Sequence, residues 1–227
     1  MKLLTDPNLK ASKIDQLVPY PKSKRLFDFS LALILIIILL PFILLVYLAT
    51  KIEGLINKNT RGPFLYIETR ISRGQPFNFY KIRIFKPKVI AETLKNKGFI
   101  HTKPLERKKE NLTLIGRFLK KFYLDESVQL FNVLKGEMSL VGTRPWNQVD
   151  YQKEVAKGIF RKKIIKAGLT GLVQVTKGQH QNFAGQDLGL DDYYIAYCRS
   201  HSPQQIILFD LKIIFQTLLK LIAGRGL

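Results

Sequence analysis

The sequence predicts a mainly helical α+β protein with one membrane-embedded segment. Three observations support this fold class: an apolar run without a charge from Phe29 to Ala49, a strand-turn-strand pattern over residues 64–85, and helical apolar spacing in two later segments. A chain of 227 residues has room for one ordinary domain and an anchor. We therefore expect a basic N-terminal segment (1–23), a membrane helix (24–50) and a single domain (51–227).

The apolar run has the length that a bilayer core requires, which is roughly 20 residues. Pro41 lies in its middle, where proline removes a helical hydrogen bond and crowds the preceding turn. A straight transmembrane helix and a re-entrant helix broken at Pro41 both remain open on this evidence. Because basic residues tend to stay on the cytoplasmic side, basic residues at both ends favour the re-entrant, monotopic form. They are Lys22, Lys24, Arg25, Lys51, Lys58 and Arg61.

Beyond the anchor, residues 64–85 predict a β-hairpin with Ser72, Arg73, Gly74 and Pro76 in its turn. Residues 86–110 are polar and contain two prolines, so we expect a loop with at most one short helix. Residues 206–222 are apolar except for a narrow polar stripe. That stripe fits a buried helix or an amphipathic helix in the membrane interface, and the charges within it favour the interface.

The formal net charge of +20 arises from 37 Lys and Arg against 17 Asp and Glu. Such a surface attracts anions, which include nucleic acid, anionic lipids and phosphorylated substrates. The sequence contains no helix-turn-helix, zinc or RNP pattern, so nucleic acid is not an expected partner. A membrane-tethered basic module without catalytic activity, binding anionic lipid or nucleic acid, remains the alternative that charge and anchor alone would support.

An acidic pair, Asp125 and Glu126, stands before apolar residues at helical spacing that end at Gly136. By spacing alone this is an ordinary helix start, with Asp125 as the N-cap and Glu126 in the first turn. A short β-prone run then leads to Arg144. Its guanidinium can bind two phosphate oxygens at once, although a surface salt bridge explains the residue equally well.

Together these segments resemble the bacterial sugar transferases, the monotopic polyprenyl-phosphate phosphoglycosyl transferases that act in capsule, O-antigen, exopolysaccharide and glycoprotein assembly. The resemblance covers nearly the whole chain. It rests on KRLFDF (24–29), Pro41, GPFLYIETRISRGQPFNFYKIRIF (62–85), LTLIGRFLKKFYLDESVQLFNVLKGEMSLVGTRP (112–145), AGLTGLVQV (167–175) and FDLKIIFQT (209–217). Thr143 departs from the pattern, because the family has proline before this arginine.

The resemblance implies that Asp125 is a catalytic nucleophile and that Glu126 holds Mg²⁺ or orients the site. The reaction implied is transfer of a sugar 1-phosphate from a nucleotide sugar, usually a UDP sugar, to polyprenyl (undecaprenyl) phosphate. A covalent phosphosugar ester on Asp125 would be the intermediate, and direct transfer with Asp125 as general base is the alternative. The expected location is the cytoplasmic face of the bacterial inner membrane.

The donor carries clustered negative charge that repels a carboxylate, so the site needs cations. Mg²⁺ would bridge Glu126 and the phosphates, while Arg144, Lys81 and Arg83 would bind oxygens that do not react. Anionic membrane lipids are further expected partners. A homodimer is plausible on general grounds of symmetry, without a residue that specifies it.

Overall fold

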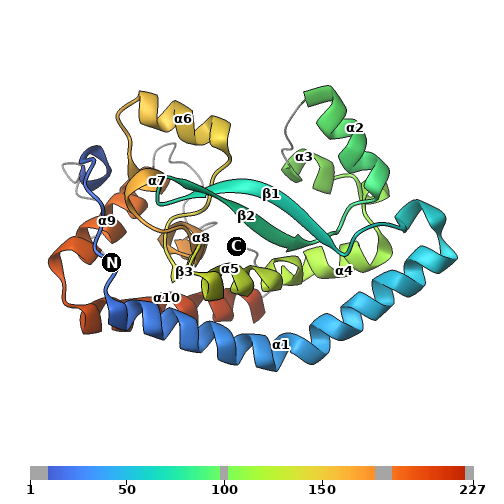
Figure 1. Ribbon diagram of the computed structural model, residues 1–227, viewed down its shortest axis with the longest axis horizontal. Helices are drawn as coiled ribbons and strands as arrows, with labels where there is room; N and C mark the ends of the chain where they lie inside the picture. Colours follow the sequence, from blue (N-terminus) through green and yellow to red (C-terminus); the bar gives the residue numbers. More distant parts are fainter. Residues whose placement is uncertain (1–9, 98–101, 177–185, 223–227) are drawn as a thin grey trace. The chain divides into compact units, whose positions relative to one another are not determined.

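The computed structural model describes residues 10–97, 102–176 and 186–222 (Figure 1). Helices predominate, which confirms the predicted mainly helical α+β class. The α-helices are α1 (Lys22–Ile56), α2 (Pro87–Lys97), α3 (Thr102–Glu106), α4 (Leu114–Lys121), α5 (Leu130–Lys135), α6 (Gln148–Ala156), α7 (Arg161–Ile164), α8 (Leu172–Thr176), α9 (Gln186–Ser200) and α10 (Pro203–Ile222). The strands are β1 (Leu65–Ser72), β2 (Gln75–Ile82), β3 (Ser139–Val141) and β4 (Gly168–Thr170).

The chain forms two compact units, each built from segments that are distant in sequence. Unit 1 comprises Met1–Leu35, Glu68–Phe79 and Gln129–Leu227, and unit 2 comprises Ile36–Ile67 and Tyr80–Val128. Their boundaries fall within α1 and within both strands of the hairpin, so they do not follow the boundary that the sequence suggested at residue 51.

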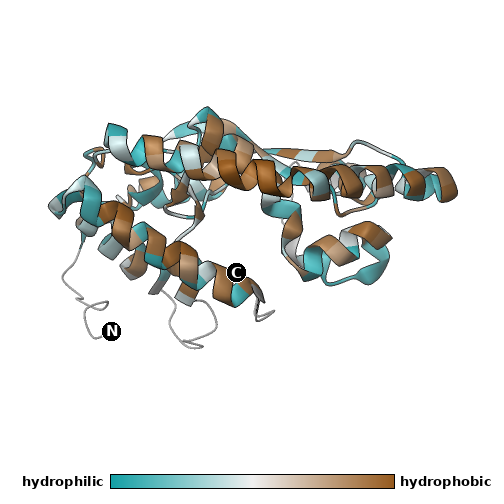
Figure 2. Cartoon of the chain, turned by 90° about the horizontal axis from the view of Figure 1, so that it is seen from below, coloured by the Kyte–Doolittle hydropathy of each residue, from teal (hydrophilic) through white to brown (hydrophobic). Residues whose placement is uncertain are grey.

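Helix α1 contains the predicted membrane segment and is long and apolar enough to cross a bilayer. The helix continues through Pro41, so the expected break does not interrupt it. A proline costs one backbone hydrogen bond, and the bonds on either side of it hold this long helix together. Hydrophobic residues occupy most of its length (Figure 2), and the side chains of Ile37, Ile38 and Leu45 are more than half exposed.

The hairpin is confirmed, with β1 and β2 paired and joined at Arg73-Gly74. Both turn residues have positive φ, 51° and 75°, which suits the right-handed twist of the flanking strands. In unit 1, β3 and β4 form a parallel pair with Ser139 opposite Gly168. A Cβ on Gly168 would lie 2.1 Å from the nitrogen of Gly142, so glycine is needed for this close approach.

The expectation of a loop over residues 86–110 was wrong, because helices α2 and α3 occupy much of it. Pro87 is the first residue of α2, and Pro104 lies in the first turn of α3. Proline is favoured in the first turn, where its missing N–H would have no intrahelical partner. In this segment the prolines therefore mark helix starts.

The first turn of α1 is held in unit 1 by a buried network of charges. Lys24 Nζ lies 2.7 Å from Asp28 Oδ1, 2.7 Å from Asp210 Oδ2 and 2.8 Å from Ser139 Oγ. Asp28 also accepts hydrogen bonds of 2.6 Å from Ser139 and Tyr20. Lys24 and both carboxylates are almost completely buried. Asp28 is thus paired with a neighbouring cation, and the network links α1 to β3 and α10.

Burial raises the pKa of Asp210 to about 6, and the charge of Lys24 opposes this shift. Tyr194 also donates a hydrogen bond of 2.8 Å to this carboxylate. Asp210 therefore depends on Lys24 to remain ionised at neutral pH.

The neighbouring Arg25 caps the end of α5. Its guanidinium donates hydrogen bonds of 2.6 Å to the carbonyls of Val133 and Leu134, and Lys166 donates to the carbonyl of Gly136. Carbonyls at the end of a helix carry the negative end of the helix dipole, which favours cations there. Two cations thus fix the end of the helix that follows the acidic pair.

We expect Lys24→Met to lower the free energy of unfolding by about 3–5 kcal/mol near pH 8, because it leaves two buried carboxylates without their cation. The folded-state pKa of Asp210 is already raised and rises further without Lys24. On acidification the folded variant therefore takes up a proton before the unfolded chain does, and the defect shrinks at pH 5. Thermal unfolding in detergent at both pH values measures this. Lys88→Met, at an exposed lysine, is the control, and an equal defect at both pH values would contradict the prediction.

Candidate functional site

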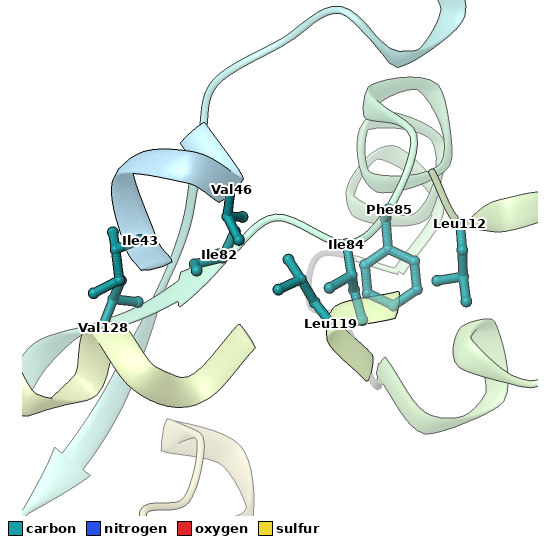
Figure 3. Close-up of a cluster of buried hydrophobic side chains, with 8 residues drawn as sticks. All are labelled: Ile43, Val46, Ile82, Ile84, Phe85, Leu112, Leu119 and Val128. Atoms are coloured by element: carbon teal, nitrogen blue, oxygen red, sulfur yellow. The ribbon is translucent and has the colours of Figure 1, made fainter. Parts of the chain in front are cut away.

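The acidic pair lies in unit 2, whose apolar core fixes the surrounding segments (Figure 3). Side chains from α1, from β2 and the residues after it, and from the segment around α4 pack together. They are Ile43, Val46, Ile82, Ile84, Phe85, Leu112, Leu119 and Val128. Val128 lies two residues after Glu126 and is 3% exposed. The core therefore holds the chain just after the acidic pair in place, and β2 is the strand beside the pair.

Helix α4 leads into the site and is capped firmly at its start. Thr113 Oγ1 accepts from the nitrogen of Gly116 at 2.8 Å, and the Glu53 carboxylate accepts from the nitrogens of Leu114 and Ile115 at 2.7 and 3.2 Å. A carboxylate there also complements the positive end of the helix dipole. Gly116 packs directly on the backbone of Ile84, where a Cβ would lie 2.1 Å from the carbonyl oxygen.

Tyr123, which precedes the acidic pair, has a positive φ of 56°. The 3-10 helix η5 (Leu124–Gln129) follows and carries both acidic residues. The expectation that Asp125 caps an α-helix was therefore wrong, because the α-helical part, α5, begins only at Leu130. Its predicted end at Gly136 is confirmed by a left-handed φ of 79°. The tight 3-10 turn places Asp125 inside the element instead of before it.

Asp125 is a buried carboxyl group, 8% exposed. Burial, followed by the charge of Glu126, raises its pKa to about 7, while Lys81 opposes the shift and Glu106 adds to it. A carboxylate with few water contacts and a pKa near neutrality is typical of a reacting group. Glu106 was not predicted from the sequence, because it lies in the segment expected to be a loop.

Glu126 is paired with Lys81 of β2 at 3.0 Å. Both side chains are partly exposed, in contrast to Asp125. The structure thus brings three predicted residues, Asp125, Glu126 and Lys81, into one region of unit 2. The cation contacts Glu126 directly and lowers the pKa of Asp125 through its charge.

Arg83 is arranged differently from Lys81. Its Nε, Nη1 and Nη2 donate to the carbonyls of Pro63, Phe85 and Thr60 at 2.6, 2.6 and 2.8 Å. The side chain is buried, and burial lowers its pKa. These bonds tie the end of β2 to the segment before the hairpin, which is a positioning role and differs from the predicted phosphate contact.

Arg144 belongs to unit 1 and follows β3. It is partly buried. Within the described residues its guanidinium has no ion pair, so the surface salt bridge considered from the sequence is not found there.

Binding of Mg²⁺ at this site depends on the carboxylates that lie there. Among the described residues, no three or more His, Cys, Asp or Glu side chains gather as metal ligands. Mg²⁺ is commonly bound by one or two carboxylates together with substrate phosphates. Asp125 and Glu126 fit that donor set, with Glu126 the more exposed of the two.

The model of the bacterial sugar transferase family matches residues 20–224. The chain belongs to this family. The match includes α1, the hairpin, the acidic pair and α10, so the resemblance drawn from the motifs is confirmed.

Several curated proteins are similar to the chain. It is 36% identical over 67% of its length to "Galactosyl transferase CpsE" of Streptococcus agalactiae, covering 35% of that protein. It is 31% identical over 89% of its length to an "Undecaprenyl-phosphate glucose phosphotransferase" of Komagataeibacter xylinus, covering 36% of it. It is 30% identical over 90% of its length to "Exopolysaccharide production protein ExoY" of Sinorhizobium fredii, covering 87% of it. The chain thus spans about a third of the first two relatives and most of the third.

We expect Gly116→Ala to destabilise the protein by several degrees in thermal unfolding, because the new methyl group meets backbone and not a flexible side chain. Gly189→Ala is the matched control. Gly189 lies within α9 with open space around it, and alanine there should stabilise by up to about 1 kcal/mol. Equal changes in unfolding temperature for the two variants would show that the contact between α4 and Ile84 is looser than described.

Proposed function

We propose that the protein transfers a sugar 1-phosphate from a nucleotide sugar, most simply a UDP sugar, to polyprenyl phosphate. The observation that carries the proposal is the buried Asp125 beside Glu126 and Lys81, in a chain of the bacterial sugar transferase family. The similarity to an undecaprenyl-phosphate glucose phosphotransferase supports undecaprenyl phosphate as the acceptor. The product would enter the assembly of a polysaccharide or another glycoconjugate.

In the proposed reaction, a carboxylate oxygen of Asp125 forms a bond to the sugar-linked phosphorus of the donor. The bond from that phosphorus to the bridging oxygen breaks, and UMP leaves with the electron pair. A phosphate oxygen of the polyprenyl phosphate then attacks the same phosphorus and releases the Asp125 carboxylate. Two displacements replace one, and the attacking form of Asp125 is the carboxylate, so the proton that it holds below its pKa of about 7 must leave first.

The cations of the site offset the repulsion between a carboxylate and a diphosphate. We assign Lys81 and Arg144 to phosphate oxygens that do not react, and we give Arg83 the role of holding the end of β2. Glu126, with Asp125, would hold Mg²⁺, which neutralises phosphate charge and polarises the phosphorus when bound. Lys81 contacts Glu126 and supplies positive charge to the site. A neutral residue at position 81 should therefore weaken binding of the donor phosphates.

The intermediate can be trapped by incubating the protein with a radiolabelled UDP sugar and Mg²⁺ without the lipid acceptor. We expect label to remain on the wild-type protein and to be absent from Asp125→Asn, whose transfer rate should fall by at least about 1,000-fold. Glu126→Gln should still fold and should require more Mg²⁺. An active preparation that never retains label would favour direct transfer with Asp125 as general base. Full activity of Asp125→Asn would exclude both mechanisms.

We further propose that α1 is re-entrant and that the protein is bound to the inner membrane with both units on the cytoplasmic face. The basic residues at both ends of α1 support this topology. Lys22 and Lys58 are exposed and lie on either side of the apolar run.

This topology can be tested with Lys22→Cys and Lys58→Cys, each in a Cys198→Ser background. In spheroplasts, a membrane-impermeant maleimide should label neither cysteine until the membrane is permeabilised. A helix that spans the bilayer would instead leave one of the two cysteines accessible from outside.

A further inference from the structure

The segments that follow β3 and β4 meet at one edge of the pair. The chain after β3 folds back there, so that Thr143 forms a parallel bridge with Ala167 and accepts a hydrogen bond of 2.8 Å from the nitrogen of Gly168. Thr143 and Arg144 follow β3, while Gly171 and Gln174 follow β4. A Cβ on Gly171 would lie 2.2 Å from the carbonyl oxygen of Gly142 and 3.2 Å from Gln174 Oε1. The amide of Gln174 therefore lies beside the peptide that joins Gly142 to Thr143.

Two side chains at this edge are buried without satisfying their polar atoms. Thr143 is 1% exposed and Gln174 is 5% exposed. Neither Thr143 Oγ1 nor Gln174 Oε1 has a hydrogen-bond partner among the residues that the structure describes. Thr170 of β4 provides the contrast, because its equally buried hydroxyl pairs with Thr217 at 2.6 Å. An unpaired buried polar atom is costly, so such atoms often mark a place where another molecule binds.

Arg144 follows Thr143 directly and forms no ion pair with any residue that the structure describes. A ligand that suits all three residues must carry an anion for the guanidinium and an O–H or N–H donor for Gln174 Oε1, which can only accept. A nucleotide sugar has both, because its diphosphate is flanked by hydroxyl groups and, in uridine, by an imide N–H. A polyprenyl phosphate is mostly a dianion near neutral pH, so it offers chiefly acceptor oxygens and hydrocarbon, which suit the amide oxygen poorly.

We propose that Thr143 and Gln174 are donor-recognition residues, which hydrogen-bond the hydroxyl or N–H groups of the nucleotide sugar while Arg144 binds its phosphate. This inference rests on the proposed function and deepens it, because it assigns this edge of unit 1 to the donor and not to the lipid acceptor. It also gives a role to a threonine that departs from the family pattern.

The test uses Thr143→Val and Gln174→Met, which keep the size of each side chain and remove the unpaired oxygen. Calorimetry with UDP-glucose measures donor affinity, and steady-state assays give separate KM values for donor and acceptor. We expect each variant to weaken UDP-glucose binding by about 10-fold, the effect of one lost hydrogen bond, and to leave the acceptor KM unchanged. Without ligand, both variants should be at least as stable to heat as the wild type.

Two controls separate recognition from structure. Thr143→Ser keeps the hydroxyl and should retain donor affinity, whereas Thr170→Val removes a satisfied hydroxyl and should lower thermal stability without changing donor affinity. Unchanged donor affinity in Thr143→Val and Gln174→Met, with a wild type that transfers sugar phosphate, would overturn the inference alone. A wild type that binds UDP-glucose without any transfer would instead count against the proposed function, and the calorimetric comparison would still decide the role of this edge.

Discussion

The contact on which the start of the fold depends is the ammonium group of Lys24 between two buried carboxylates. Removing three charges from water is expensive, and an apolar cluster of the same shape could be equally stable. A charge network differs from an apolar cluster because it accepts only one arrangement of its partners. Asp28 lies one turn along α1 and Asp210 lies on α10, so the network fixes how the first turn of an otherwise featureless apolar helix joins unit 1.

The acidic pair also combines a lysine with two carboxylates, but the lysine contacts only one of them directly. In the Lys24 network each carboxylate contacts the cation, whereas Lys81 contacts Glu126 and leaves Asp125 to be stabilised at a distance. As a result, Asp125 is buried, has a raised pKa and sits beside a like charge. A group held in this way is stabilised when positive charge arrives, which suits a carboxylate that meets a metal-bound or lysine-bound phosphate.

The sequence predicted those elements whose local chemistry decides their structure. The hairpin follows from Arg73-Gly74 between alternating strands, and the end of α5 follows from Gly136. The predictions from the sequence failed where the same residue type occurs in two kinds of structure. Pro87 was interpreted as loop punctuation and is a helix start. The acidic pair was interpreted as the start of an α-helix and lies in a 3-10 helix, which follows the positive φ of Tyr123.

The candidate site also contains features that the sequence did not predict. Lys81 and Arg83 are two apart, which in a strand places both side chains on one face. Strand β2 ends at Ile82, however, so Arg83 lies beyond the alternation and turns to three backbone carbonyls. No local pattern in the sequence reveals where a strand stops relative to a functional residue. The unpaired oxygens of Thr143 and Gln174 were equally hidden, because only tertiary packing shows that a polar atom is buried without a partner.

Helix α10 has a buried face within unit 1 and an exposed apolar face. Its inward face carries Asp210, Ile213 and Thr217, all buried and bound within unit 1. Its other face leaves Leu208 and Phe215 more than half exposed. An apolar surface of this kind is unfavourable in water and favourable at a bilayer interface. Polar residues therefore direct the helix into the protein while apolar residues point away from it, the reverse of a helix on the surface of a soluble domain.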